Sequence, residues 1–554
     1  MSIKYYSLGG QDERFRYSGV LELHGDVFLL NAGASCVNAN LYDIEEIIPD
    51  YKILLPLKSR LKGVFIGVPR ELNISSIPYL LQMFPNLPIY TNSFGAEIIN
   101  SFLARFESVK GKRISPKIIT LDLVSEHSVT TDVKVVPIKV AATLPNSLAW
   151  AFKFSQSEYV VFIDEFVVAS ENLPCRDNQL NVLFQNLKSK VSLLIIGTQS
   201  CATVSTFALK PSDNFVYLKK LVSRINTRLI VAIYLDDWYT IFNLSKIAYI
   251  YRYNFSIFPD ELSVQFNSFL EKNKLKEYMS SVNELNSDGK KVQIVVVAGT
   301  HNTLYSYLRK ILEGVEPRLK LIPKDVIIFM TNTFIEKELE EISTINELAR
   351  NGGEVLKAPS SLVPYMAGAE DIMLLVNCLS PYNVVPVNGF YKDYVEFNKS
   401  LSNVMNPRKI HFLENGNYIT LDRKNVTVIE NEISEVYVSG QEMLDINRNT
   451  LFERKLLAQS GVIIIAIRCN NKKNVISKPI VKMMSVFAKD FQKQDEALTQ
   501  VKNYLRQDLS KYLQFNSEID NRSLKQTIRK SVYHALDPFL FRKPSILAVI
   551  SHLH

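Results

Sequence analysis

The sequence lacks an apolar run long enough to cross a membrane. A membrane-spanning helix needs about 20 mostly apolar residues, whereas the apolar runs of this 554-residue chain, such as 295–298 and 462–467, have the length of a strand. The first residues, MSIKYY, also lack the apolar core of a signal peptide. We therefore expect a cytoplasmic protein with no membrane partner.

Cysteine is scarce, and the five cysteines are scattered along the chain: Cys36, Cys175, Cys201, Cys378 and Cys469. A disulfide framework or a cysteine zinc site requires paired or closely spaced cysteines, such as C-x-x-C. Because the sequence contains no such spacing, we expect buried, unpaired thiols.

Over most of the chain, neither positive nor negative charge is in marked excess. The net charge of +8 arises in residues 451–554, which hold 18 Lys and Arg against 8 Asp and Glu. The first 450 residues are therefore slightly acidic, which is unusual for a protein that holds a polyanion. Any nucleic-acid groove in this part must be local.

Short apolar segments alternate with helical patterns, which predicts an α/β fold. The first 200 residues suggest a sandwich, and residues 205–354 suggest a doubly wound layer inserted into it. Strands are expected at 27–30, 64–66, 133–136, 159–163, 193–196, 229–234, 292–297 and 325–329, and helices at 267–285 and 304–312.

After residue 355 the sandwich pattern resumes. We expect a polar connector at 430–450 and a small α/β segment at the end of the chain. The expected elements are a strand at 384–387, a hairpin at 410–421 turned at Asn415-Gly416-Asn417, strands at 461–467 and 546–550, an amphipathic helix from 498 to 512 and a helix at 523–536.

The stretch 63–80 combines a strand, a turn and a helix, with Ser75 or Ser76 as candidate N-cap and Pro78 in the first helical turn. It resembles the metallo-β-lactamase loop of ribonuclease J, where T-H-G-H-E-D-H-I-G-G precedes a helix that opens L-P-Y-L. In this sequence, the four positions that bind metal in the family read Val68, Arg70, Leu72 and Asn73.

Further segments extend the resemblance over essentially the whole chain. Leu8-Gly9-Gly10 is similar to the family's L-G-G, and the span from 299–301 to 353–355 aligns without gaps. The resemblance implies a metallo-β-lactamase αββα sandwich with an inserted doubly wound β-CASP domain and a small C-terminal α/β domain. The implied domains are the sandwich at 1–204 and 356–430, β-CASP at 205–355, a linker at 431–450 and a dimerisation domain at 451–554.

Members of this family hydrolyse RNA with two zinc ions, from the 5′ end or internally. The remaining metal-binding positions of the family fall here on Asn31, Ala142, Glu165 and Asn388. Val, Leu and Ala offer no lone pair to zinc, and Arg70 would place a cation beside a dication. The resemblance therefore implies no catalytic residues, no bound metal and no cofactor, with only Asp164 and Glu165 as residual ligand candidates.

Two interpretations of Asp164 and Glu165 remain open. They could form a shifted metal site with His301, or they could lie at a strand end and pair with Arg70, which would then replace the lost metal charge. The second is favoured because a metal site needs three or more convergent ligands.

A loop at Gly299, Thr300, His301 and Asn302, together with Lys392, is a candidate for RNA or phosphate binding. Backbone N–H groups ahead of a helix can accept a phosphate, but an ordinary surface loop explains the same residues equally well.

The helix within the last hundred residues carries one apolar stripe, made of Leu498, Val501, Leu505, Leu509 and Tyr512. We expect this stripe to pack against a partner, as in a dimerisation module, while the surrounding Lys and Arg side chains could contact phosphates.

The resemblance thus predicts a non-catalytic subunit of RNA processing and decay that binds RNA and pairs with a catalytic ribonuclease J paralogue, with a possible homodimer through 451–554. The alternatives are a weakly active metal-dependent ribonuclease and a scaffold that binds RNA or ribosomes.

Overall fold

The computed structural model describes most of the chain. The described residues are 2–13, 15–36, 44–111, 113–121, 125–168, 178–198, 206–208, 211–283, 293–332, 334, 337–362, 366–422, 425–439, 442–444, 446, 448–470, 475–487, 491–515, 519–540 and 543–552. The chain forms two compact units, of which the first ends at Leu444 and the second comprises residues 445–554.

Two sheets face each other in the first unit. One has the order β21 (Asn425–Ile429), β20 (Tyr418–Asp422), β1 (Ser2–Ser7), β2 (Gly19–Leu23), β3 (Asp26–Leu30), β6 (Leu61–Phe65), β7 (Pro88–Thr91), β8 (Lys117–Thr120). The other has the order β19 (Val384–Val387), β13 (Val191–Gly197), β12 (Tyr159–Ile163), β11 (Leu148–Lys153), β10 (Lys134–Lys139), β9 (His127–Ser128). Their inner faces meet in an aromatic core, where the Phe65 ring packs against Trp150 and Phe152.

Helices cover the outer faces of both sheets. On the first sheet, α2 (Ile77–Met83) and α3 (Ser93–Lys110) bury Leu80 and Leu103. On the second, α4 (Leu180–Leu187) and α10 (Ala369–Leu379) bury Leu183 and Leu375. The result is an αββα sandwich.

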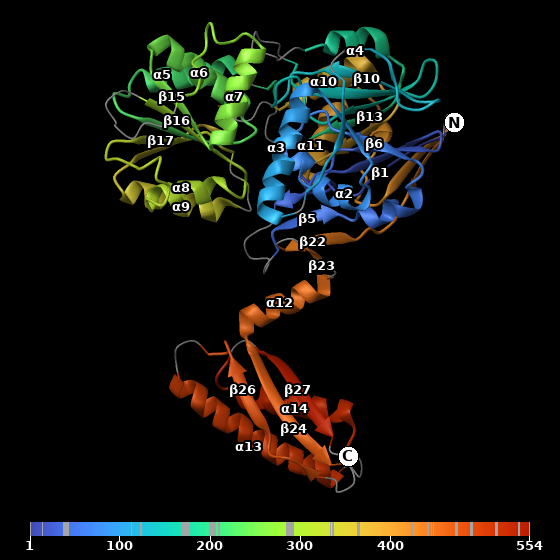
Figure 1. Ribbon diagram of the computed structural model, residues 1–554. Helices are drawn as coiled ribbons and strands as arrows, with labels where there is room; N and C mark the ends of the chain where they lie inside the picture. The colour runs from blue at the N-terminus through green and yellow to red at the C-terminus, as the bar shows by residue number, and fades with distance from the viewer. Residues whose placement is uncertain are drawn as a thin grey trace. The chain divides into compact units, whose positions relative to one another are not determined.

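A third sheet, within the same unit, is parallel throughout. Its order is β15 (Asn254–Phe258), β16 (Gln293–Gly299), β14 (Leu229–Tyr234), β17 (Val326–Phe329), β18 (Glu354–Lys357). Helices cover both faces (Figure 1): α5 (Pro211–Val222), α6 (Trp238–Tyr251) and α7 (Asp260–Lys272) on one, α8 (Leu304–Leu312) and α9 (Glu338–Arg350) on the other. Because both faces are buried, β14 reads as a continuous apolar run.

The predicted fold class is confirmed: an α/β sandwich, an inserted doubly wound layer and a small C-terminal α/β domain. Several elements, including β12, β14, β19 and α8, have the predicted bounds. The helix expected at 267–285 instead begins at Asp260, directly after Pro259. Asp260 and Glu261 favour that start because acidic side chains in the first turn interact well with the helix dipole.

The hairpin expected at 410–421 is also wrong. The strands that pair are β20 and β21, which both follow Gly416. The turn at Gly416, where φ is +90°, leads the chain into β20. Asn415 fixes this turn against the N-terminal segment, because its Oδ1 accepts a hydrogen bond of 3.0 Å from the Gln11 N–H.

The segment expected as a polar linker contains strands. β22 (Glu435–Ser439) pairs with β5 (Glu46–Pro49) of the first unit and with β23 (Glu442–Leu444). Polar neighbours hide this strand in the sequence, although Val438 is buried and Glu435 pairs with Arg16 at 3.0 Å. The helix α12 (Arg448–Ser460) follows. The other domain bounds remain predictions.

The second unit is built on β24 (Val462–Asn470), which pairs with β25 (Val475–Ile476), β26 (Ile480–Met484) and β27 (Ser545–His552). Two helices, α13 (Phe491–Phe515) and α14 (Asn521–Leu536), cover one face. The α13 stripe, including Leu505 and Leu509, is buried in this core. Its expected role as a partner surface is therefore wrong, since amphipathicity predicts burial but not the covering element.

The thiols have partly the expected environment. Cys469 is buried and Cys378 is half-buried, and both are free. The side chain of Cys36, and Cys175 and Cys201 as a whole, lie outside the described part of the chain. In the part of the chain that the structure describes, no helix is long and apolar enough to cross a membrane.

Candidate functional site

The candidate site lies where strands of the sandwich end. Asn31 follows β3, residues 68–73 follow β6, Asp164 and Glu165 follow β12, and Asn388 follows β19. The carboxyl ends of parallel strands form a common edge, where ligands usually bind in α/β folds. All of these polar side chains are buried except that of Glu71, which is half-buried.

Asp164 lies among three asparagine side chains. Its Oδ2 accepts hydrogen bonds from the Nδ2 atoms of Asn31 at 2.8 Å and Asn73 at 2.6 Å. Its Oδ1 accepts a longer bond, of 3.4 Å, from Asn388 Nδ2. Each asparagine stands where the family resemblance places a metal-binding residue. These amides therefore donate hydrogen to a carboxylate from positions where a metal ion would need a lone pair.

Neighbouring groups fix two of these amides. Asn388 Oδ1 accepts a bond of 2.9 Å from the Phe15 N–H, so its Nδ2 must face Asp164. Asn73 Nδ2 also donates to the Val68 carbonyl at 2.8 Å. Asn31 and Asn388 hold left-handed φ values of 61° and 59°, which asparagine adopts more readily than most residues.

Burial raises the pKa of Asp164 to about 6, and the Glu165 carboxylate acts in the same direction. The hydrogen bonds from Asn31 and Asn388 and the charge of Arg70 oppose this rise in pKa. The amides thus stabilise the ionised carboxylate only in part, as expected for neutral donors.

Arg70 binds two carboxylates at once. Its Nη1 donates to Glu165 Oε1, and its Nε donates to Asp236 Oδ2 at 2.7 Å. Thr143 Oγ1 donates to the other Glu165 oxygen at 2.5 Å. Burial disfavours the Arg70 charge, but Glu165 and Asp236 more than compensate and raise the pKa of Arg70. The cation therefore persists in the buried site.

Asp236 was not predicted as a site residue. It follows β14 of the inserted sheet, so the ion pair between Arg70 and Asp236 joins that sheet to the sandwich. Burial opposes its ionisation, but Arg70, His301 and the hydrogen bonds to Asp236 together outweigh burial and lower the pKa of Asp236. The sequence did contain a signal for Asp236, because this carboxylate, like that of Asp164, follows directly after a buried strand.

The other family metal positions are apolar. Val68 and Ala142 lie in one core cluster with Phe94 and Leu144, and Leu72 is buried. Together with the amides and the guanidinium, these side chains do not fit a dinuclear zinc centre. Among the described residues, no three His, Cys, Asp or Glu side chains form a metal-binding group, so the alternative site of Asp164, Glu165 and His301 is not assembled.

His301 belongs to an aromatic cluster. Its ring centroid lies 4.5 Å from that of Tyr234 and 4.1 Å from that of Phe334. Burial lowers the pKa of His301 to about 3, with Asp236 opposing and Arg70 and Lys337 adding to the effect. The ring is therefore neutral near pH 7 and supplies no cation for a phosphate.

The rest of the predicted phosphate loop bonds to itself. Thr300 N–H donates to Thr303 Oγ1 at 2.8 Å, and Asn302 N–H donates to Thr300 Oγ1 at 3.1 Å. These bonds occupy N–H groups that a phosphate would need. Lys392, on α11 (Tyr391–Leu401), is exposed with its Nζ 5.8 Å from the Phe390 ring centre. Phosphate binding by these residues stays a prediction.

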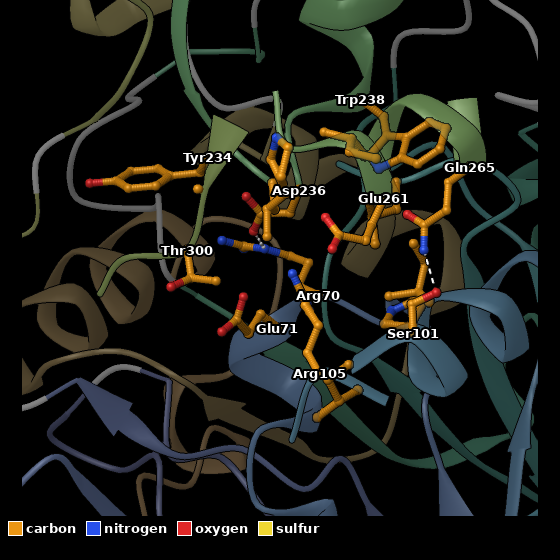
Figure 2. A pocket seen from close by; sticks show the side chains of 18 of the residues that line it. Arg70, Glu71, Ser101, Arg105, Tyr234, Asp236, Trp238, Glu261, Gln265 and Thr300 are labelled. Carbon is orange, nitrogen blue, oxygen red and sulfur yellow. Dashed lines mark hydrogen bonds and ion pairs between the residues drawn. The ribbon is translucent and has the colours of Figure 1, made fainter. Parts of the chain in front are cut away.

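A cavity of about 510 Å³ opens beside Arg70 and Asp236 (Figure 2). Gly299, Thr300 and His301 also line it, whereas Lys392 does not. The structure therefore brings most of the predicted loop to the cavity that Arg70 and Asp236 line. Asp164 and the asparagines around it do not line this cavity.

Known proteins resemble this chain both in its C-terminal part and over its full length. Residues 449–553 match the family described as Ribonuclease J C-terminal domain. Over 99% of both chains, the protein is 28% identical to an uncharacterised protein of Mycoplasma genitalium. It is 22% identical to Ribonuclease J 2 of Staphylococcus saprophyticus and of Staphylococcus aureus, over 100% of this chain and 98% of each relative.

A solved structure shares the fold. It is a protein of unknown function from Enterococcus faecalis, with a TM-score of 0.52 and 10% identity over 77% of this chain and 100% of its own. The α/β layers fit the metallo-β-lactamase and β-CASP architecture, and the similarity to the two Ribonuclease J 2 proteins spans the full length. Together with the C-terminal match, these findings show that the chain is similar to the ribonuclease J family along its whole length.

Proposed function

We propose that this protein is a non-catalytic ribonuclease J-like subunit of RNA processing and decay, acting in the cytoplasm with a catalytic ribonuclease J paralogue. The observation that carries the proposal is the set of contacts around Asp164. Hydrolysis by two metal ions needs ligands that hold both ions and activate water between them. Three amide donors, a guanidinium and three apolar side chains occupy all but one of the eight positions that would supply those ligands.

Electrostatics support the same proposal. Arg70 lies at a former metal position and its charge is already balanced by Glu165 and Asp236. A dication there would meet a buried cation in a medium of low dielectric constant, where repulsion is strong. Arg70 thus supplies the positive charge that the two carboxylates need, and its guanidinium cannot activate water.

RNA and a second protein chain are the proposed partners. The relatives named Ribonuclease J 2 support RNA as a ligand of the family. For a homodimer through residues 451–554, the open face of the β24 sheet replaces the α13 stripe as the proposed contact. Ile480, Met484, Leu547 and Val549 project from it with exposures of 66%, 58%, 54% and 47%. Apolar groups exposed together commonly mark a protein interface.

The deciding experiment assays decay of 5′-monophosphorylated RNA by this protein, by a catalytic ribonuclease J and by their mixture. Enhanced decay only in the mixture is expected. Decay by this protein alone, with two zinc ions per chain, would refute the proposal and favour an autonomous ribonuclease. RNA binding without association with the catalytic protein would instead favour a scaffold.

A matched control uses the catalytic partner mixed with Leu547→Lys. If the catalytic protein contacts the same open sheet face as the proposed homodimer does, this variant should lose the enhancement while retaining its own fold. An unchanged enhancement would place the contact elsewhere.

A further inference from the structure

The cavity beside Arg70 has the size and lining of a small-molecule site. Its volume is about 510 Å³, within the range of roughly 300–1,000 Å³ that is usual for such sites. It lies between α1 (Glu71–Ile74), α3 and α7, with the ends of β14 and β16 behind it. Its apolar wall includes Ile74, Ile98, Leu144, Trp238, Leu262 and Val264.

Contacts between α3 and α7 hold the cavity in shape. Gln265 on α7 donates a hydrogen bond to Ser101 on α3, as the dashed line in Figure 2 shows. Lys272 and Glu97 form an ion pair between the same helices. The walls are therefore joined independently of any ligand, as expected for a preformed site.

Three residues that line this cavity have a buried polar atom without a hydrogen-bond partner: Glu71, Trp238 and His301. Glu71 is the one that carries a carboxylate. Its Oε2 is shut off from solvent and has no hydrogen-bond partner. Figure 2 shows its carboxylate and those of Asp236 and Glu261 around the same space. Burial raises the pKa of Glu71 to about 7; Arg105 opposes this rise, and Asp236 and Glu46 add to it. An unpaired carboxylate is costly here, so a donor that reached it would be held strongly.

The charges of the cavity lining have a negative excess. Arg70 is already bound by Glu165 and Asp236, which leaves Arg105 as the other cation against Glu71 and Glu261. An anion such as a phosphate would be repelled by these carboxylates. A cation with an apolar body matches both the charge and the wall.

We propose that this cavity binds an aliphatic amine, with an ammonium group at Glu71 and its methylene chain against Ile74, Ile98 and Leu262. Glu261, at the exposed rim, accepts a second ammonium group when the ligand is a diamine. This site is independent of the proposed RNA function, because it requires neither RNA nor a partner chain.

The test is isothermal titration of the full-length protein with 1,6-diaminohexane at low ionic strength. We expect binding of the diamine and at least tenfold weaker binding to Glu71→Gln, since the variant loses a charged hydrogen bond. Hexane-1,6-diol, which has the same body without charge, should bind at least tenfold more weakly than the diamine, and inorganic phosphate should not compete.

Two variants separate the site from non-specific attraction. Glu107→Gln makes the same charge change on the exposed side of α3, outside the cavity, and should bind the diamine as the native protein does. Ala104→Trp places a large side chain in the opening and should abolish binding. Equal loss in Glu71→Gln and Glu107→Gln, unchanged affinity in Glu71→Gln, or competition by phosphate would each overturn the proposal.

Discussion

Arg70 Nε lies 2.7 Å from Asp236 Oδ2, although 166 residues separate the two in the sequence. The bond joins the turn after β6 to the end of β14, and the same guanidinium binds Glu165. A single cation thus connects the sandwich and the inserted parallel sheet. Its position is one where the family resemblance places a zinc ligand, and we propose that its charge replaces the charge that a metal would supply.

We expect Arg70→Ala to destabilise the first unit by about 3–5 kcal/mol, because it leaves two buried carboxylates without their cation. Urea unfolding followed by circular dichroism measures the change. Asp236→Asn, which keeps the Glu165 pair, should cost less. An unchanged unfolding midpoint for Arg70→Ala would show that the charge has no structural role.

The bond between Asn73 and Asp164 should be measurable in a double-mutant cycle. Asn73→Leu alone should lower the free energy of unfolding by about 1–3 kcal/mol, since it removes a donor from a buried carboxylate. The same change in an Asp164→Leu background should cost less, with a coupling of about 1 kcal/mol or more. Additive losses would mean that the amides around Asp164 do not act on its carboxylate.

His301 should make the stability of the first unit depend on pH. Its pKa is lowered to about 3 in the folded protein from 6.5, so below about pH 6.5 the unfolded chain binds a proton that the folded chain does not. Stability is therefore lost as the pH falls. At pH 5 the loss from this group should be about 2 kcal/mol relative to pH 7.5.

His301→Phe and His301→Gln should both remove this pH dependence. The phenylalanine variant retains the ring contacts with Tyr234 and Phe334, so it should also be the more stable of the two at pH 7.5. Thermal unfolding at pH 5 and pH 7.5 gives both comparisons. If all three proteins lose the same stability on acidification, the histidine is not the source.

Within the second unit, Leu547→Lys and Leu505→Ala should act differently. Leu547 is 54% exposed on the open sheet face, whereas Leu505 is fully buried on α13. We expect Leu505→Ala to cost about 2–5 kcal/mol. Leu547→Lys should change stability little and reduce self-association, measured by sedimentation velocity. Self-association that survives Leu547→Lys would exclude this face as the dimer contact.

Local patterns in the sequence were sufficient for the α/β class, the order of the layers and some of the strands, such as β12, β14 and β19. Buried parallel strands such as β14 are continuous apolar runs, and their period and length are visible without any knowledge of the fold. Boundaries set by distant contacts were not visible: β22 pairs with β5, almost 400 residues earlier in the chain. Polar composition alone therefore suggested a linker.

By itself, the sequence determined that the family's metal-binding positions hold amide, cationic and apolar side chains, because residue chemistry can be read at each position. Only the tertiary structure decided what those side chains do. Asn31, Asn73 and Asn388 reach one carboxylate because the strands that carry them end at one edge. The same holds for Arg70 and Asp236, and for the unpaired Glu71 oxygen, since contacts between distant segments exist only after the layers have packed.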